Sequence, residues 1–146
     1  ARVSRDERAA LLRSAGALIG RQLAAGLFNR DHKPSNVIVV SETGHDLALI
    51  DIAGVRRPAF ATSSTFVTLG ARMCASILIE PRGVGVAIEA EDLSIVVAEV
   101  VIGATTVWAG ITASDLRRKM LERASAIIAA HGDPAPKVNP LDQPAP

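Results

Sequence analysis

A carboxylate, a cation and an amide are closely spaced in one short polar segment of the chain. Asp31 is followed two residues later by Lys33 and five residues later by Asn36. Pro34, between them, disfavours a continuous helix. A second carboxylate, Asp51, follows the next hydrophobic run. A proton acceptor, a cation and oxygen ligands for a hard metal ion are the groups that phosphoryl transfer needs. The spacing therefore predicts a phosphoryl-transfer loop followed by a magnesium-binding aspartate.

The overall composition limits the classes of protein to which the chain can belong. Its 146 residues are enough for one domain with a substantial core, and 49% of them are hydrophobic while 21% are charged. A net charge of +1 argues against a nucleic-acid-binding module, which normally has a basic face. The single cysteine, Cys74, cannot form an internal disulfide, so a cytoplasmic location is expected. We find no signal peptide, and no apolar stretch reaches the roughly 18 residues of a membrane span.

The spacing of apolar residues predicts an α+β fold that is mainly helical. Ser4 followed by Glu7 is a capping-box pattern, and the apolar residues behind it recur at helical spacing until a helix end near Gly26. Residues 37–40 and 47–50 are short strand candidates on either side of a turn-rich segment. Together they predict a β-hairpin.

A second helix is expected after an irregular segment at residues 52–64. It begins at Ser63 or Ser64, and residues 80–83, which include a proline and a glycine, stop it. One side of this helix is apolar and is predicted to be buried: Phe66, Leu69, Met73, Ile77 and Leu78.

The remaining part of the chain predicts two more helices and a tail. Residues 91–108 combine strand-forming β-branched residues with the length of a helix, and we favour a buried helix with Asp92 as its cap. Ser114 caps the last helix, which Gly132 closes, and residues 133–146 are a proline-rich flexible tail. Its inward residues are Leu116, Met120, Leu121, Ala124, Ile127 and Ile128.

The polar segment at residues 29–36, Asn-Arg-Asp-His-Lys-Pro-Ser-Asn, resembles the His-Arg-Asp-Leu-Lys-Pro-x-Asn loop of protein-kinase-like proteins. Residues 50–54, Ile-Asp-Ile-Ala-Gly, stand where the Asp-Phe-Gly motif of that family would be. The order of helix, polar loop, hairpin, aspartate and helices is similar to the C-terminal lobe of the kinase-like fold. The resemblance implies that residues 1–132 form such a lobe, with a small hairpin carrying the metal site.

The same resemblance implies a role for each polar residue, with ATP and Mg²⁺ as cofactors. Asp31 would accept the proton of the attacking hydroxyl, and Lys33 would steady the transferred phosphoryl group. Asn36 and Asp51 would hold Mg²⁺.

Several residues depart from the family pattern. Asn29 replaces the usual His that braces the metal-binding segment, His32 replaces a packing Leu, and Ala53 stands where a flexible Gly belongs. No Gly-rich loop or strand Lys precedes the polar loop, and the chain opens without Met directly on a helix start. We therefore expect a piece of a longer kinase whose N-terminal lobe is missing here, and no phosphotransfer by this chain alone.

The short, Ala- and Val-rich segment after Asp51 looks most like the bacterial lipopolysaccharide kinases, which phosphorylate Kdo or heptose of the inner core. This implies a small-molecule or glycolipid acceptor, no nucleic-acid partner, and peripheral association with the inner face of the membrane. Arg56 and Arg57 are candidates for contacting an anionic substrate, although they can equally be solvated arginines. Two alternatives stay open: a protein Ser/Thr kinase-like enzyme, and a non-catalytic pseudokinase or binding module.

Other polar residues of the chain have simpler interpretations. For His32 we favour a structural role, bonded to nearby backbone, over a contact with substrate. The hydroxyls of residues 62–65 are expected to be helix caps rather than a phosphorylated segment that pairs with Arg30. Cys74 on an apolar helix is expected to be a buried small hydrophobe.

Overall fold

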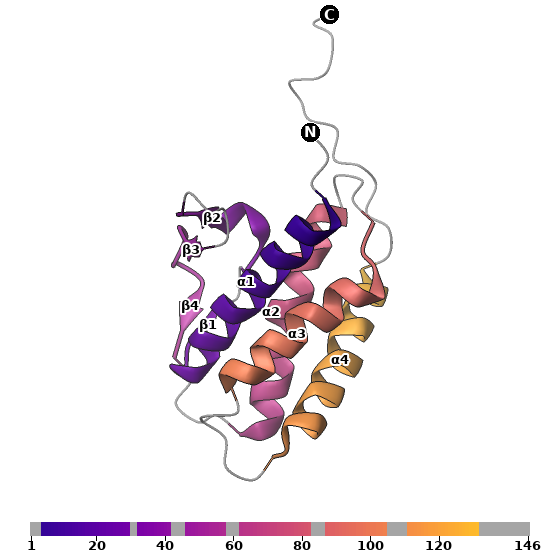
Figure 1. Cartoon of the computed structure of the whole chain (residues 1–146). Coiled ribbons are helices and arrows are strands. Elements are labelled where there is room, and N and C mark those ends of the chain that lie inside the picture. The colour runs from indigo at the N-terminus through magenta and orange to yellow at the C-terminus, as the bar shows by residue number, and fades with distance from the viewer. Residues whose placement is uncertain are drawn as a thin grey trace, which may run out of the picture.

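Four helices form the body of the structure, and short strands lie along one side of them (Figure 1). The computed structural model describes residues 4–29, 32–41, 46–57, 62–82, 87–104 and 111–131. This arrangement confirms the predicted class, α+β and mainly helical. None of the described helices is long and apolar enough to cross a membrane. The helices are α1 (Arg5–Ala24), α2 (Ser63–Arg82), α3 (Ala90–Ala104) and α4 (Ala113–Ala130).

The strands pair as two separate antiparallel ribbons. The predicted hairpin is confirmed as β2 (Val37–Val39) paired with β3 (Leu47–Leu49), with Val37 opposite Leu49. The second ribbon was not predicted, because β1 (Phe28–Asn29) and β4 (Val55–Arg56) have two residues each. Strands this short carry no periodic pattern that a sequence can reveal.

Helix α1 begins and ends where its capping residues predict. The Glu7 amide donates to the Ser4 hydroxyl over 3.2 Å, and the Ser4 amide donates to the Glu7 carboxylate over 2.8 Å. This is the reciprocal pattern of a capping box. After the helix, Gly26 has a φ of 70°, a left-handed conformation that glycine adopts without strain.

The predicted bounds of the other helices need two corrections. Asp92 is not the cap of α3 but its third residue, and its carboxylate accepts from the Glu89 amide over 2.8 Å. Helix α4 is capped by Thr112 rather than Ser114, because Thr112 has the extended conformation that lets its hydroxyl accept from the Asp115 amide. Helix α2 begins at Ser63 and ends at Arg82, as predicted. Residues 105–108, Gly132 and residues 133–146 lie outside the described residues.

The core is formed mainly by the faces on which α1 meets α3 and α2 meets α4. Its side chains are mostly aliphatic, and the apolar stripes predicted for α2 and α4 point into it. Cys74 is fully buried there, and burial raises the pKa of its thiol to about 12. This confirms Cys74 as a packing residue that stays protonated at neutral pH.

Helices α1 and α3 approach so closely that their backbones touch. A Cβ atom placed on Gly103 would lie 3.1 Å from the Cα of Gly20. A Cβ atom on Gly16 would lie 2.5 Å from the carbonyl oxygen of Val96 and 2.8 Å from the Cβ of Glu99. Glycine is therefore required here by the distance between the two helices.

Two ion pairs join the beginnings of the same two helices. Arg5 pairs with Glu91 over 2.5 Å, but both side chains are exposed, so water screens the attraction. Arg8 pairs with the buried carboxylate of Asp92 and also donates to the Ala87 carbonyl over 2.7 Å. The Arg8 contacts therefore hold the segment before α3 as well as its first turn.

We predict that Gly16→Ala lowers the free energy of unfolding by about 1–3 kcal/mol, although Ala is the better helix former by about 1 kcal/mol. The reason is that the added methyl group meets backbone, which cannot move without separating α1 from α3. The measurement is urea denaturation of the purified chain.

Gly70→Ala is the matched control for this prediction. Its added Cβ would meet the terminal methyl group of Met120 at 2.4 Å, and this flexible side chain can move aside. An equal loss of stability in both variants would contradict a specific backbone contact at Gly16.

Candidate functional site

The β2–β3 hairpin brings two of the predicted site residues to the same end of one ribbon. Asn36 immediately precedes β2, and Asp51 comes two residues after the end of β3. The Ile50 amide donates to the Asn36 carbonyl over 3.0 Å, which extends the antiparallel register by one position. The residue that immediately precedes Asp51 is therefore hydrogen-bonded to Asn36 through the backbone, although the two predicted metal ligands are far apart in sequence.

Asp51 itself lies in a tight turn. One of its carboxylate oxygens, Oδ1, accepts from the Ala53 amide over 2.9 Å, an Asx-turn that orients the side chain. The Val55 amide donates to the Ile52 carbonyl over 3.0 Å and closes the turn. The side chain of Asp51 is exposed, and its Oδ2 has no hydrogen-bond partner among the described residues. This oxygen is available to a ligand.

The unpredicted ribbon ties the beginning of the polar loop to the segment after Asp51. Asn29 is buried at the end of β1 and pairs with Val55 of β4. Strand pairing thus joins the beginning of the polar loop to the segment after Asp51. No local sequence signal indicates this contact, because each of the two paired strands has only two residues.

Glu80, near the end of α2, holds the middle of the polar loop. Its carboxylate accepts from the Ser35 amide and from the Ser35 hydroxyl, each over 2.9 Å. Ser35 is the central residue of a short 3-10 helix, Pro34–Asn36. The bidentate contact therefore fixes the position of that helix, and with it Asn36. The sequence did not identify Glu80, because it is 45 residues from Ser35 and contact at that separation leaves no spacing pattern.

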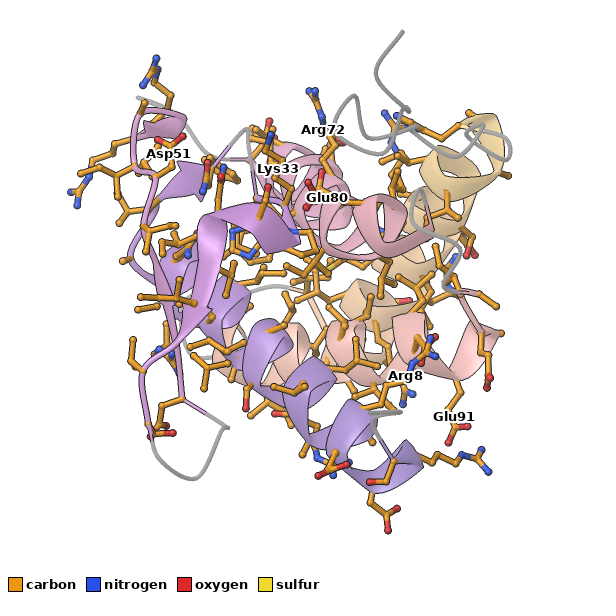
Figure 2. All side chains as sticks on the ribbon, turned by 90° about the horizontal axis from the view of Figure 1, so that it is seen from above. Arg8, Lys33, Asp51, Arg72, Glu80 and Glu91 are labelled. Atoms are coloured by element: carbon orange, nitrogen blue, oxygen red, sulfur yellow. The ribbon has the colours of Figure 1, made fainter. Side chains whose placement is uncertain are left out.

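Lys33 is exposed immediately before the 3-10 helix. Figure 2 shows Lys33, Glu80 and Asp51 on the same side of the molecule. Asp31, the predicted proton acceptor, and Arg30 lie outside the described residues. The structure thus places Lys33 and Asp51 on one side of the fold, whereas Asn36 is buried.

The two arginines after Asp51 differ in their contacts. Arg56 folds back on the turn, and its Nη1 donates to the Ala53 carbonyl over 2.8 Å and to the Val55 carbonyl over 2.9 Å. Arg57 is exposed and has no partner among the described residues. Of the two, Arg57 is therefore the one whose guanidinium is available to a substrate.

The described residues of this region include few groups that could hold a metal ion. Among the described residues, no group of three or more His, Cys, Asp or Glu side chains is placed to hold a metal ion. Zinc sites generally need three or four such ligands. Mg²⁺, in contrast, commonly uses one or two protein carboxylates and completes its shell with water and substrate phosphates. Of the two predicted ligands, Asp51 has an exposed carboxylate, whereas Asn36 is buried.

Within the loop, the side chain of His32 is fully buried, and neither of its ring nitrogens has a hydrogen-bond partner among the described residues. The prediction that it bonds to nearby backbone is therefore wrong. Burial lowers the pKa of His32 from 6.5 to about 4, since the charged ring would lose its hydration. His32 is neutral at pH 7 and fills a core position, as the Leu of the family pattern would.

The hydroxyls at the start of α2 act as predicted. Thr62 accepts from the Thr65 amide over 3.1 Å, and its carbonyl accepts from the Phe66 amide over 2.9 Å. These are the contacts of an N-cap residue. The prediction that this cluster caps a helix is confirmed for Thr62.

Comparison with protein-family models, with curated proteins and with solved structures found no match to this chain.

We predict that the chain loses stability as the pH falls from 6.5 to 4. The pKa of His32 is lower in the folded state than in the unfolded state, so acid protonates the unfolded chain first. Above pH 6.5 His32 contributes nothing to this pH dependence, and below it the loss grows to on the order of 3 kcal/mol.

The measurement is the free energy of unfolding in urea at pH 7 and pH 4. His32→Leu should remove this part of the pH dependence while it keeps the packing. His131→Gln, at the exposed end of α4, is the matched control and should behave as the wild type does. A pH dependence that His32→Leu leaves unchanged would show that His32 is not the group responsible.

Proposed function

We propose that this chain is the C-terminal lobe of a kinase-like phosphotransferase, which moves the γ-phosphoryl group of ATP to a hydroxyl group. The observation that carries the proposal is the hydrogen bond between the Ile50 amide and the Asn36 carbonyl. Because of that register, an amide and a carboxylate from separate segments come to one end of the hairpin, where the polar loop also ends. The resemblance of residues 29–36 to the kinase loop assigns chemistry to this arrangement.

In this proposal each residue has one task. Asn36 and Asp51 hold Mg²⁺, which neutralises charge on the phosphates of the bound nucleotide. Lys33, exposed on the same side of the fold, neutralises the transferred group. Asp31, two residues before Lys33, accepts the proton of the attacking hydroxyl. The Glu80 carboxylate positions the loop through Ser35 and does not touch the reacting atoms.

The acceptor that we propose is a sugar of the lipopolysaccharide core. Support comes from the resemblance of the short segment after Asp51 to lipopolysaccharide kinases and from Arg57, which is exposed six residues after Asp51. An anionic core sugar suits such a guanidinium. Nucleotide-binding residues would come from a segment outside these 146 residues, and the enzyme would work at the inner face of the membrane.

We predict that the chain binds Mn²⁺, a paramagnetic substitute for Mg²⁺, through Asp51. In the presence of ATP, the metal should broaden the amide signals of Val37 and Ile50, which flank the proposed ligands. Asp51→Asn should abolish this broadening because it removes the anionic oxygen ligand. The measurement is nuclear magnetic resonance of the isotope-labelled chain.

Asp46→Asn is the matched control for metal binding. Asp46 is also exposed, but it immediately precedes β3 at the opposite end of the same hairpin. If both variants broaden as the wild type does, Asp51 is not a metal ligand and the proposed site is wrong.

We predict phosphoryl transfer from ATP to a Kdo-containing lipid A by the product of the complete reading frame that encodes these residues. Asp31→Asn should lower kcat about 10²- to 10⁴-fold, the usual effect of removing a general base. The 146 residues alone should transfer nothing, since no Gly-rich phosphate-binding segment precedes Asp31. The measurement is incorporation of labelled phosphate.

The same assay separates the alternatives. Labelling of a generic protein but not of the sugar would indicate a protein kinase instead. Labelling of neither, with ATP still bound, would indicate a non-catalytic binding module. Turnover of ATP by the 146 residues alone would contradict the expectation that the nucleotide-binding residues of the active site lie in another segment.

A further inference from the structure

A cavity of about 500 Å³ lies between the beginning of α2 and the middle of α4. It is separate from the candidate active site. Ser63, which lines it, and Glu80, which holds the polar loop, are near opposite ends of α2. The helix has 20 residues and is therefore about 30 Å long. Among the described residues, none of the proposed phosphotransfer machinery lines this cavity.

Two cations line the α4 wall of the cavity. Lys119 and Arg123 are one helical turn apart, so they lie on the same face of α4. Both are exposed, and neither forms an ion pair in the part of the chain that the structure describes. The only carboxylate that lines the cavity there, Glu122, already accepts from Arg118 over 3.0 Å. The wall therefore carries a net positive charge that is not neutralised.

The α2 wall adds uncharged donors. The hydroxyls of Ser63 and Ser64 form no hydrogen bond with any described residue. Thr68, one helical turn after Ser64, also lines this wall. The opposite wall of the cavity thus offers hydrogen-bond donors to the same volume that the cations face.

An apolar surface completes the cavity between these two polar walls. Val67, Ile111 and Ala126 contribute it. The cavity is open to solvent, and its volume is larger than a bare oxyanion needs. The apolar surface suits the face of a sugar ring, while the hydroxyls of α2 suit its hydroxyl groups.

We propose that this cavity binds a small phosphorylated molecule of sugar size. Lys119 and Arg123 hold the phosphate group through charge-assisted hydrogen bonds. Ser63 and Ser64 bond to the polar body of the ligand, which packs on Val67 and Ile111. This cavity is independent of the proposed phosphotransferase function, because no described residue belongs to both sites. Either proposal can therefore be wrong without affecting the other.

The test titrates the isotope-labelled chain with glucose 6-phosphate and follows the amide signals of Ser63 and Ser64. Saturable shifts at these two residues are expected, and they should weaken as salt is added, because exposed charges are screened. Lys119→Gln and Arg123→Gln should each raise the Kd about tenfold, which is the effect of losing one charge-assisted hydrogen bond.

Arg117→Gln is the matched control, since Arg117 is an exposed cation of the same helix that lines the groove toward α3 instead. Its Kd should stay within about twofold of the wild type, because only distant, screened charge is lost. An equal loss of affinity in all three variants would overturn the assignment of Lys119 and Arg123.

Glucose and inorganic phosphate test the two halves of the proposed ligand. Both should bind more weakly than glucose 6-phosphate, since each makes only part of the contacts. Glucose that binds as tightly would overturn the role of the cations, and inorganic phosphate that binds as tightly would overturn the role of the α2 wall. The absence of any saturable shift would overturn the site itself.

Discussion

The backbone contact between α1 and α3 is the constraint on which the other elements depend. At Gly20 and Gly103 no side chain separates the two helices, so a change in either position would produce either a clash or a gap. The Arg8–Asp92 pair fixes the same two helices at their beginnings. With α1 held in this way, the point at which the chain leaves it near Gly26 is also set, and the polar loop begins a few residues later.

From that point, three contacts of different kinds determine the shape of the loop region. Strand β1 pairs with β4, the hairpin register extends through Ile50, and the Glu80 carboxylate accepts from Ser35. Each contact joins residues that are distant in sequence, and none of them uses the side chain of Lys33 or the Oδ2 oxygen of Asp51. Lys33 and one oxygen of Asp51 can therefore remain exposed while the backbone around them is held.

Some polar side chains in the interior of the protein have no hydrogen-bond partner among the described residues. His32 is buried without partners for its ring nitrogens, and the side-chain amide of Gln22 is in the same situation. An unsatisfied buried polar group costs about 1–3 kcal/mol, so a purely structural optimum would place apolar residues here.

Local sequence patterns determined much of this protein. The capping box of Ser4 and Glu7, the apolar stripes of the long helices and the two short apolar runs of the hairpin specify their elements through contacts of a few residues, which leave a recognisable pattern in the sequence. The contacts of Ser35 with Glu80 and of Asn29 with Val55, and the cavity between α2 and α4, were decided only by tertiary structure. The physical reason is that these features join single residues across long separations, where packing alone determines which side chains meet.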